Sequence, residues 1–365
     1  MGTCLDCGAS GGAISGRIGF CADCIRGNFI ENWPRIRRVH EASRQRFGLP
    51  LSPPRTSDGI HCGLCMHDCR LDEGEIGFCG LRRAEGDRIV GGRPHEGNLA
   101  SMLDPLPTNC VASFTCPGGT GCGYPNYAHR RGPERGYRNL AVFYNSCGFN
   151  CLFCQNHHFK SFTRSAGGVT AKDLARAADS STSCICYFGG DPTPQLLHAI
   201  KASRLARRRT EGGIMRICWE SNGSMSPEYL EPIFQLSLDS GGCIKFDLKA
   251  WSESIHYALC GVSNRRTLEN FRILAGWAGQ RRDPPLLLAS TLLVPGYVDS
   301  REVGALARFI ASLDPEIPYS LLAFHPAFEL TDLPISSRDQ AESCRDAALE
   351  AGLANVHLGN VHLLR

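Results

Sequence analysis

The sequence predicts an α/β fold in which a partial TIM-type barrel of about six βα units follows small cysteine-rich metal-binding domains. From residue 139 onward, short apolar runs alternate with longer helical patterns, as expected of buried parallel strands and their crossover helices. Fourteen of the twenty cysteines stand at or before Cys154, nearly all in short-spaced groups that are typical of metal ligands. We therefore expect four regions, at residues 1–27, 28–58, 59–138 and 139–365.

Composition and charge exclude several classes of protein. The chain has 365 residues, of which 42% are hydrophobic and 21% charged, as in ordinary globular proteins. A formal net charge of +3 does not favour nucleic acid as a partner. No apolar run approaches the roughly 18 to 20 residues of a membrane span, and the first residues do not resemble a signal peptide. We expect a cytoplasmic protein without a membrane partner.

The first region contains two C-x2-C pairs joined by a short loop rich in Gly and Ser. This pattern indicates a four-thiolate site in a zinc-ribbon-like knuckle. Zinc is favoured over iron and over free thiols, because no redox role is needed and metal binding would supply the folding free energy of so small a segment. The expected ligands are Cys4, Cys7, Cys21 and Cys24.

The second region is expected to hold a helix that begins near Pro34, because proline is tolerated in the first turn of a helix. Prolines after residue 49 indicate a linker. A set of arginines on the helix is interpreted as a solvated surface; it comprises Arg35, Arg37, Arg38, Arg44 and Arg46.

The third region carries two further groups of cysteines. The first group could form a closed cage for zinc or for an auxiliary iron–sulfur cluster, and its spacing does not choose between them; it comprises Cys62, Cys65, Cys69 and Cys79. The second group has five-residue gaps, which leave metal ligation open beside plain packing or redox chemistry; it comprises Cys110, Cys116 and Cys122. Six later cysteines are scattered and are interpreted as small buried side chains.

The expected strands of the last region are residues 140–146, 184–188, 215–221, 243–248, 286–294 and 319–324. Helix starts are indicated by the boxes Thr170-x2-Asp173 and Asp299-x2-Glu302, and by Thr193-Pro194 and Ser226-Pro227. A last strand within residues 355–364 is expected to close the barrel. Functional sites of such barrels lie at the C-terminal ends of the strands.

The motif Cys147-x3-Cys151-x2-Cys154 follows the first of these strands. A four-iron four-sulfur (4Fe-4S) cluster normally takes four cysteines, so three would leave one iron open for a small molecule. With Phe153 and the following Gln-Asn, the motif resembles the signature of the radical S-adenosylmethionine (SAM) superfamily, in the branch that includes pyruvate formate-lyase activating enzymes. The resemblance implies a 4Fe-4S cluster and SAM as cofactors.

Segments at the later strand ends are similar to motifs of the same family. Gly189-Gly190-Asp191 looks like the glycine-rich methionine-binding motif, although the family usually has Glu where this chain has Asp191. The resemblance implies further SAM or substrate contacts from Glu220, Ser221, Asn222, Asp247, Lys249, Pro295 and His325. From the residues alone, a buried structural ion pair stays an alternative for Asp247 with Lys249, and a core histidine is an alternative for His325.

The family resemblance implies a radical enzyme that abstracts hydrogen from a carbon of a protein or peptide substrate. It also implies a one-electron donor such as ferredoxin or flavodoxin. One alternative is a cobalamin-dependent radical SAM protein C-methyltransferase, for example acting on methyl-coenzyme M reductase, with segment 105–128 covering the cobalamin. A second alternative is a zinc-ribbon binding module fused to an inactive barrel. The sequence leaves the substrate open.

Overall fold

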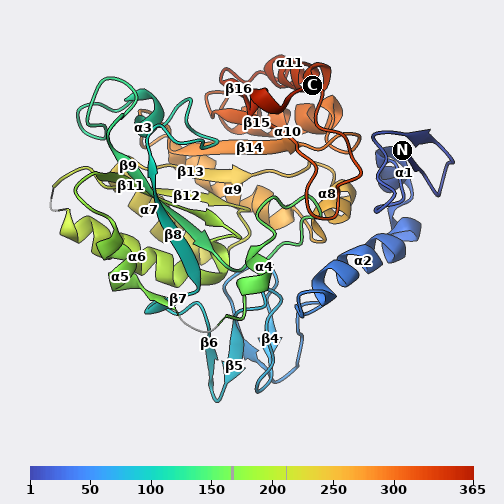
Figure 1. Cartoon of the computed structure of the whole chain (residues 1–365), viewed down its shortest axis with the longest axis horizontal. Coiled ribbons are helices and arrows are strands. Elements are labelled where there is room, and N and C mark those ends of the chain that lie inside the picture. The colour runs from blue at the N-terminus through green and yellow to red at the C-terminus, as the bar shows by residue number, and fades with distance from the viewer. Residues whose placement is uncertain (166–167, 211) are drawn as a thin grey trace.

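A computed structural model describes residues 1–165, 168–210 and 212–365, and its centre is one eight-stranded sheet (Figure 1). Seven strands are parallel and follow one another in chain order, and one edge strand is antiparallel to its neighbour. The strands are β8 (Leu99–Pro105), β9 (Arg138–Tyr144), β11 (Thr182–Gly189), β12 (Arg216–Ser221), β13 (Ile244–Asp247), β14 (Leu287–Leu293), β15 (Tyr319–Ala323) and β16 (Val356–Gly359). All six predicted strands are present.

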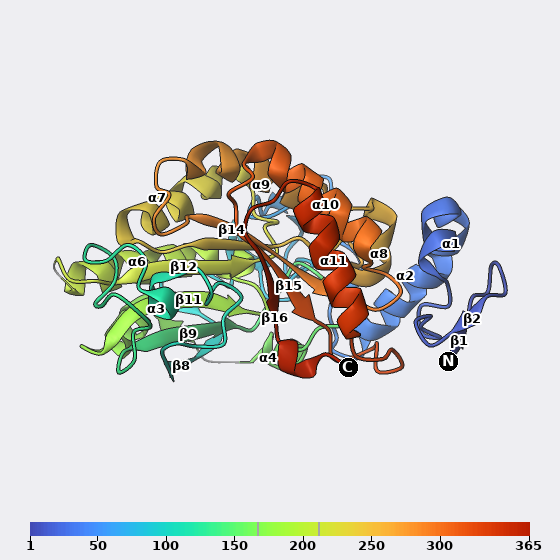
Figure 2. The same cartoon turned by 90° about the horizontal axis from the view of Figure 1, so that it is seen from above.

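Helices cover one face of this sheet, which curves around the opposite face (Figure 2). The helices are α5 (Ala171–Ala177), α6 (Leu196–Arg209), α7 (Leu230–Ser240), α8 (Glu253–Cys260), α9 (Arg265–Ala278), α10 (Ser300–Leu313) and α11 (Arg338–Glu350). The alternation of strand and helix confirms the predicted α/β partial barrel. Apolar side chains between sheet and helices form the core; Tyr187, Trp219, Ile244 and Phe246 are examples from the strands.

The barrel stays open, which corrects the expectation that the last strand closes it. Strand β16 does form, but it pairs only with β15 in the described part of the sheet. The opposite edge is taken by β8, which runs antiparallel along β9 from Leu99, opposite Tyr144, to Pro105, opposite Arg138. After four residues β16 gives way to the 3-10 turn η3 (Val361–Leu363).

Predicted helix starts are found where side chains can cap them. The Thr170 hydroxyl accepts the Asp173 N–H at 3.0 Å, and the Asp299 carboxylate accepts the Glu302 N–H at 3.0 Å. Each therefore satisfies one of the N–H groups that a helix start leaves without a partner. The Thr-Pro and Ser-Pro pairs begin 3-10 turns that lead into α6 and α7; these turns are η1 (Thr193–Gln195) and η2 (Pro227–Tyr229).

The N-terminal region lies beside the barrel (Figure 1) and consists of a short hairpin and two helices. Its elements are β1 (Gly2–Thr3), β2 (Ser10–Gly11), α1 (Ala22–Gly27) and α2 (Phe29–Gln45). Helix α2 starts at Phe29, not near Pro34, so that prediction is wrong. Proline removes the N–H that would bond the Ile30 carbonyl, and Ile30 is 83% exposed, so that carbonyl can bond water instead.

One arginine of α2 also departs from the prediction of a solvated face. Arg44 is buried, and its guanidinium donates to the carbonyl oxygens of Pro50 and Phe78. It therefore fastens α2 to the cysteine-rich region that follows. Sequence periodicity alone could not separate this arginine from its exposed neighbours.

The cysteine-rich region is made of short strands and loops below the barrel in Figure 1. Its small antiparallel pairs are β3 with β4 and β5 with β6, while β7 pairs with β10. The remaining elements are β3 (Ile60–His61), β4 (Arg70–Leu71), β5 (Arg83–Glu85), β6 (Arg88–Val90), β7 (Glu96–Gly97), β10 (Val169–Thr170), α3 (Pro117–Thr120) and α4 (Phe159–Phe162). None of the helices within the described ranges is both long enough and apolar enough to cross a bilayer.

Candidate active site

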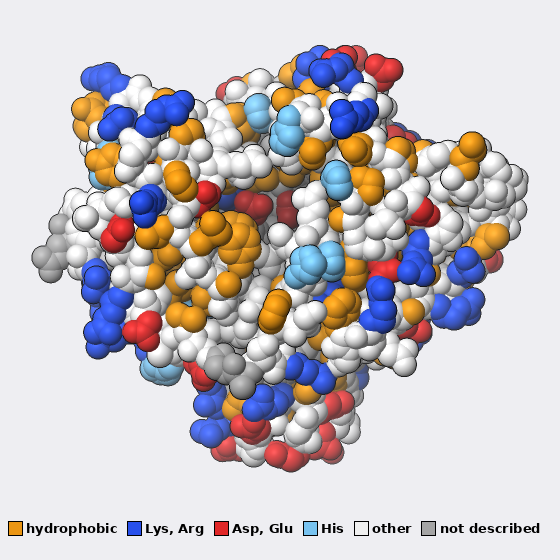
Figure 3. Space-filling view, in the orientation of Figure 1, with side chains coloured by type: hydrophobic (Ala, Val, Ile, Leu, Met, Phe, Trp, Pro, Cys, Tyr) orange, Lys and Arg blue, Asp and Glu red, His pale blue; other side chains and the backbone are white. Residues whose placement is uncertain are grey.

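A pocket lies at the C-terminal ends of the parallel strands, where the fold predicts a site. The face in Figure 3 is hollowed near its middle, with acidic side chains in the depth and hydrophobic ones along one rim. Eleven of the residues predicted for this end of the barrel line the pocket: Cys147, Cys151, Cys154, Gly189, Gly190, Asp191, Glu220, Ser221, Asn222, Asp247 and Lys249. Three cysteines and residues from three later strand ends thus face one space.

The cysteine loop directly after β9 presents its three thiols to this pocket. The Cys147 sulfur accepts the Phe149 N–H at 3.3 Å and the Asn222 amide at 3.7 Å. Such bonds favour a sulfur that carries negative charge. Three soft thiolate donors in one loop suit iron–sulfur ligation better than oxygen-preferring metals. The donor set therefore fits a 4Fe-4S cluster with one iron left for a small ligand.

Gly189 and Gly190 bring the second strand end against the first. Gly189 has a φ of 102°, which disfavours other residues, and a Cβ at Gly190 would lie 2.4 Å from the carbonyl oxygen of Ser146. The Gly190 N–H donates to Tyr144 O at 2.9 Å. This N–H is therefore engaged with the neighbouring strand, so the glycine pair serves close packing as well as lining the pocket.

Asp191 connects two strand ends through its buried carboxylate. Oδ1 accepts the Ser221 hydroxyl and the Asn222 N–H, both at 2.9 Å, and Oδ2 accepts the Thr193 N–H at 2.9 Å. Burial raises the pKa of Asp191 although these three donors oppose the shift. The shorter side chain, where the family usually has Glu, thus finds its partners within the protein.

Glu220 and Lys245 are opposite each other on β12 and β13, and Lys245 Nζ lies 3.3 Å from Glu220 Oε2. Burial raises the pKa of Glu220 to about 7, while Lys245 opposes the rise. Two residues after Lys245, Asp247 accepts two hydrogen bonds: the Lys249 ammonium donates to Oδ2 at 2.7 Å, and the Ser290 hydroxyl donates to Oδ1 at 2.6 Å. Glu220, Asp247 and Lys249 therefore form the charged wall of the pocket.

Lys249 stays positively charged in this wall. Burial alone would lower its pKa, but the Asp247 carboxylate raises it well above its usual range. The side chains of both residues reach the pocket. The pair is thus an ion pair, as one interpretation of the sequence held, and also part of the pocket lining.

Two predicted site residues, Pro295 and His325, lie outside the pocket as the described residues define it. Pro295 is buried, and the turn that it begins packs against the N-terminal knuckle, because a Cβ at Gly296 would lie 2.0 Å from Ala13 O. His325 is exposed. The order of the sequence could place Pro295 and His325 at strand ends. It could not show that the N-terminal knuckle packs against the turn that Pro295 begins.

Several lining residues were not predicted, and Lys160 is the most informative of them. It is buried on α4 and donates to Asn150 Oδ1 at 2.5 Å. Burial and the nearby Arg44 lower its pKa to about 8, against the effect of the cysteines. A lone lysine in the aromatic segment after Cys154 was the signal that could have indicated it.

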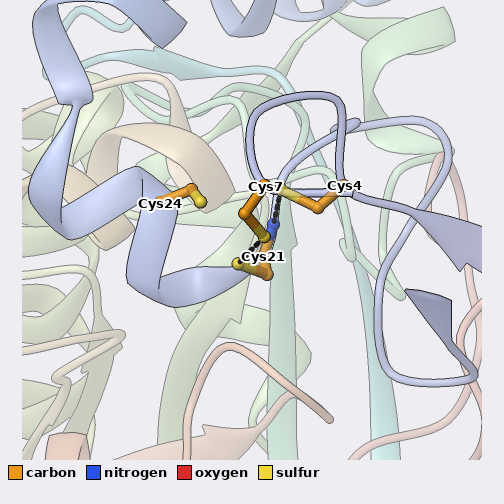
Figure 4. Close-up of side chains that lie close together, drawn as sticks. All are labelled: Cys4, Cys7, Cys21 and Cys24. Atoms are coloured by element: carbon orange, nitrogen blue, oxygen red, sulfur yellow. Dashed lines mark hydrogen bonds between the residues drawn. The ribbon is translucent and has the colours of Figure 1, made fainter. Parts of the chain in front are cut away.

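The four N-terminal cysteines come together as predicted (Figure 4). Their sulfur atoms all lie within 4.8 Å of one another, and within the described ranges no other group of possible ligands is so compact. Burial raises the pKa of Cys4, but N–H groups of Cys7, Cys21 and Asp6 outweigh it and lower the pKa to about 6. A single zinc ion with four bonds of about 2.3 Å fits this spacing.

The second predicted cage also converges. Its four cysteines line one small cavity together with His67 and Arg82; they are Cys62, Cys65, Cys69 and Cys79. The Arg82 Nε–H donates to the Cys62 sulfur at 3.1 Å. The sulfurs are not as close together as those of the N-terminal group. A cluster of several irons separates its thiolates more widely than a single ion does, so this cage accommodates either metal class.

The three cysteines of the glycine-rich segment have different surroundings. Cys110 and Cys116 pack with a second hydrophobic cluster on the sheet. The Cys122 thiol donates to the Thr115 carbonyl oxygen at 3.1 Å. Cys110 therefore lies against the cysteines of the sheet, whereas the Cys122 thiol is hydrogen-bonded within its own segment.

Comparisons with known proteins agree with this geometry. Residues 141–303 match the family described as the Radical SAM superfamily. The chain is 25% identical over 312 residues to the uncharacterised protein MJ0808 of Methanocaldococcus jannaschii, covering 83% of this chain and 81% of that protein.

Two activating enzymes are also similar. The isethionate sulfite-lyase activating enzyme of Desulfovibrio desulfuricans is 34% identical over 43% of this chain and 46% of its own length. The pyruvate formate-lyase 1-activating enzyme of Escherichia coli K12 is 29% identical over 37% of this chain and 54% of its own. The chain thus spans about half the length of these activating enzymes.

Proposed function

Residues 141–303 form a domain of the radical SAM superfamily, and from this premise we propose that the chain is an enzyme that abstracts hydrogen from a carbon of a protein or peptide. Cys147, Cys151 and Cys154 would hold a 4Fe-4S cluster, which, with bound SAM and one electron, supplies a 5′-deoxyadenosyl radical. The observation that carries the proposal is that three cysteines and three later strand ends line one pocket.

The chain's own residues would bind and orient the cofactor. Asp191 holds the Ser221 and Asn222 loop beside the cysteine loop, and Asn222 in turn donates to Cys147. The charged wall of Asp247 and Lys249 offers partners for the polar groups of an amino acid. Such fixed groups position a ligand without moving during the reaction.

Apolar side chains would exclude water from the reacting carbon. Phe149, Phe153, Phe159 and Phe188 line the same pocket, with Leu292 and Leu322 from β14 and β15. A reactive carbon radical needs protection from side reactions, and apolar side chains around the reacting carbon provide it. Hydrogen abstraction by a radical requires no general base, so no acid–base pair is assigned.

A polypeptide substrate is favoured because two similar proteins are named as activators of other enzymes. Activating another enzyme means acting on a protein. A one-electron donor such as ferredoxin or flavodoxin would supply the electron. Cobalamin-dependent methyl transfer, with segment 105–128 covering the cobalamin, is the alternative to be tested rather than the main proposal. This segment packs on the sheet through Cys110, Ala112 and Cys116.

The test is reductive cleavage of SAM by the anaerobically reconstituted full chain. Wild-type protein with iron, sulfide and dithionite should form 5′-deoxyadenosine, and Cys151→Ala should form none. The matched control is Cys344→Ala, which removes a buried thiol on α11 and should retain the activity. Absence of 5′-deoxyadenosine from all three proteins would favour a binding module with an inactive barrel. A spectral change on adding cobalamin would favour the methyltransferase.

A further inference from the structure

Three neighbouring strands carry a row of cysteines on the face of the sheet away from the helices. Cys186 of β11 and Cys218 of β12 are directly opposite in the parallel ladder. Cys243 immediately precedes β13, and its carbonyl accepts the Trp219 N–H at 2.9 Å. Residues opposite each other in a ladder point to the same face, and the three thiols pack in one cluster with Ala112 and Leu288.

Segment 105–128, which is rich in glycine, adds the thiol of Cys110 as a fourth. Cys110 packs against the cluster that holds Cys186, Cys218 and Cys243. Cys116, just before α3, packs against the same cluster. Cysteines far apart in the sequence thus pack in one cluster, in which the three on the sheet are buried and the two of the covering segment are partly buried.

A buried lysine accompanies these sulfurs. Lys245 is 1% exposed, and its Nζ lies 3.1 Å from the Cys110 sulfur and 3.5 Å from the Cys186 sulfur. A row of cysteines that only filled space would need no buried ammonium, and burying that charge is costly unless negative groups face it. Its partners are Glu220 and the two sulfurs, so the ammonium favours negative charge on Cys110 and Cys186, and the thiolate is the form that binds metals.

The width of the row distinguishes a cluster from a single ion. Strands are roughly 4.8 Å apart, so the backbones at Cys186 and Cys243 are separated by about twice that distance. One zinc ion with bonds of about 2.3 Å would need four sulfurs gathered around one point. A cluster of two or more irons, in which each iron takes its own thiolates, spans such a row.

We propose that Cys110, Cys186, Cys218 and Cys243 ligate an iron–sulfur cluster, separate from the three-cysteine loop at the pocket. This cluster would lie beside the pocket, two residues further back along β12. Glu220 lines the pocket and follows Cys218 by two residues on the same face of the strand. Lys245 would balance part of the negative charge of the thiolates. Of the four ligands, the sequence left Cys110 open between ligation and packing and predicted only packing for the other three. Cys116 is a neighbouring fifth thiol.

The test is the iron and sulfide content of the full chain after anaerobic reconstitution. Cys218→Ala should lose about two irons if the cluster is [2Fe-2S] or about four if it is [4Fe-4S], with equal sulfide. The control Cys344→Ala, also fully buried, should match the wild type. The same loss should appear in a Cys151→Ala background, so the result does not depend on SAM cleavage. Equal iron in folded Cys218→Ala and wild type would overturn the proposal.

Two further measurements cover the chance that a strand variant does not fold. Cys110→Ala changes only the covering segment and should lose the same iron as Cys218→Ala. Crystals of reconstituted wild-type protein should show anomalous scattering at the iron edge among the four sulfurs. Scattering at the Cys147 loop without a peak at the row would overturn the site. A zinc signal at the row, or a disulfide within it, would overturn its assignment as an iron–sulfur cluster.

Discussion

Asp191 and Ser221 stand on neighbouring strand ends, and the Ser221 hydroxyl donates a hydrogen bond of 2.9 Å to Oδ1 of Asp191. The same oxygen accepts the N–H of Asn222, whose side chain donates to Cys147. A single buried carboxylate therefore connects the glycine-rich turn, the third strand end and the cysteine loop. The relationship makes Asp191 a positioning residue of the proposed SAM site.

Replacing Asp191 should weaken SAM binding. In Asp191→Asn the amide can accept with only one oxygen, so the Thr193 N–H or the Asn222 N–H loses its acceptor. Leaving a buried donor unsatisfied costs about 1 to 3 kcal/mol, and we expect the Kd for SAM to rise about 5- to 150-fold when the whole of this cost falls on binding. Equilibrium dialysis on the reconstituted protein measures it.

The control for this experiment is Asp339→Asn, an exposed carboxylate in the first turn of α11. It should bind SAM as the wild type does. A Kd for Asp191→Asn equal to that of the control would show that the carboxylate does not position the site.

A buried ion pair should contribute strongly to the stability of the fold. Arg216 on β12 donates to both oxygens of Glu134, at 3.0 and 2.6 Å, and the side chains are 2% and 0% exposed. Removing one partner of such a pair costs about 3 to 5 kcal/mol, because the other charge is left buried alone. Glu134→Gln should therefore lower the free energy of unfolding by about that amount in urea denaturation.

The matched control is Asp239→Asn, which breaks the more exposed contact of Asp239 with Arg207 at 3.8 Å. Exposed pairs contribute about 0 to 1 kcal/mol. If the two substitutions lowered stability equally, the burial of Glu134 would not be the reason for its effect.

His198 should make the fold sensitive to acid. Its Nε2 faces the Val169 carbonyl at 2.9 Å and must carry the proton, so Nδ1, 2.8 Å from the Tyr144 hydroxyl, is the acceptor. Burial lowers the pKa of His198 to about 4, from 6.5 in an unperturbed histidine. The unfolded chain therefore binds a proton that the folded chain refuses, and stability present above pH 6.5 is lost as the pH falls towards 4.

The substitution His198→Gln can keep both hydrogen bonds without titrating. The free energy of unfolding of this variant should depend less on pH in that window, by up to about 1.4 kcal/mol per pH unit. The exposed His325→Gln is the control and should keep the wild-type slope. Denaturation curves at intervals between pH 4 and 7 measure the difference, and an unchanged slope in His198→Gln would contradict the assignment.

The parts of the fold that sequence reasoning predicted depend on local patterns. Apolar runs bounded by capping residues such as Thr170 and Asp299 determine strands and helix starts through contacts only a few residues long. The pocket was predictable for a similar reason, because parallel strands place their C-terminal ends at one edge. Gly189, Glu220 and Asp247 therefore had to meet.

What could not be predicted depends on contacts between distant segments. Cys110 meets Cys186 only after β11 has paired with β9 and segment 105–128 has folded over the sheet. Arg44 looks like its exposed neighbours until Pro50 of the linker and Phe78 of the cysteine-rich region each supply a carbonyl oxygen. The open edge at β16 likewise depends on β8, an antiparallel strand from the region before the barrel.

The N-terminal knuckle should need both its metal and its contact with the barrel. The Tyr297 hydroxyl accepts the Ser15 N–H and donates to Phe20 O, both at 3.0 Å, so one side chain of the barrel holds two points of the knuckle. Cys24→Ser should lose one zinc per chain. Because metal binding supplies the folding free energy of so small a segment, amide hydrogen exchange should accelerate across residues 1–27.

Tyr297→Phe should keep the zinc but lose two hydrogen bonds, which contribute about 0.5 to 1.5 kcal/mol each. Amide hydrogen exchange should therefore accelerate less than in Cys24→Ser. The exposed Tyr124→Phe is the control for removing a hydroxyl. Unchanged zinc content and exchange in Cys24→Ser would contradict the four-thiolate zinc site, whereas wild-type exchange in Tyr297→Phe would contradict only the docking contact.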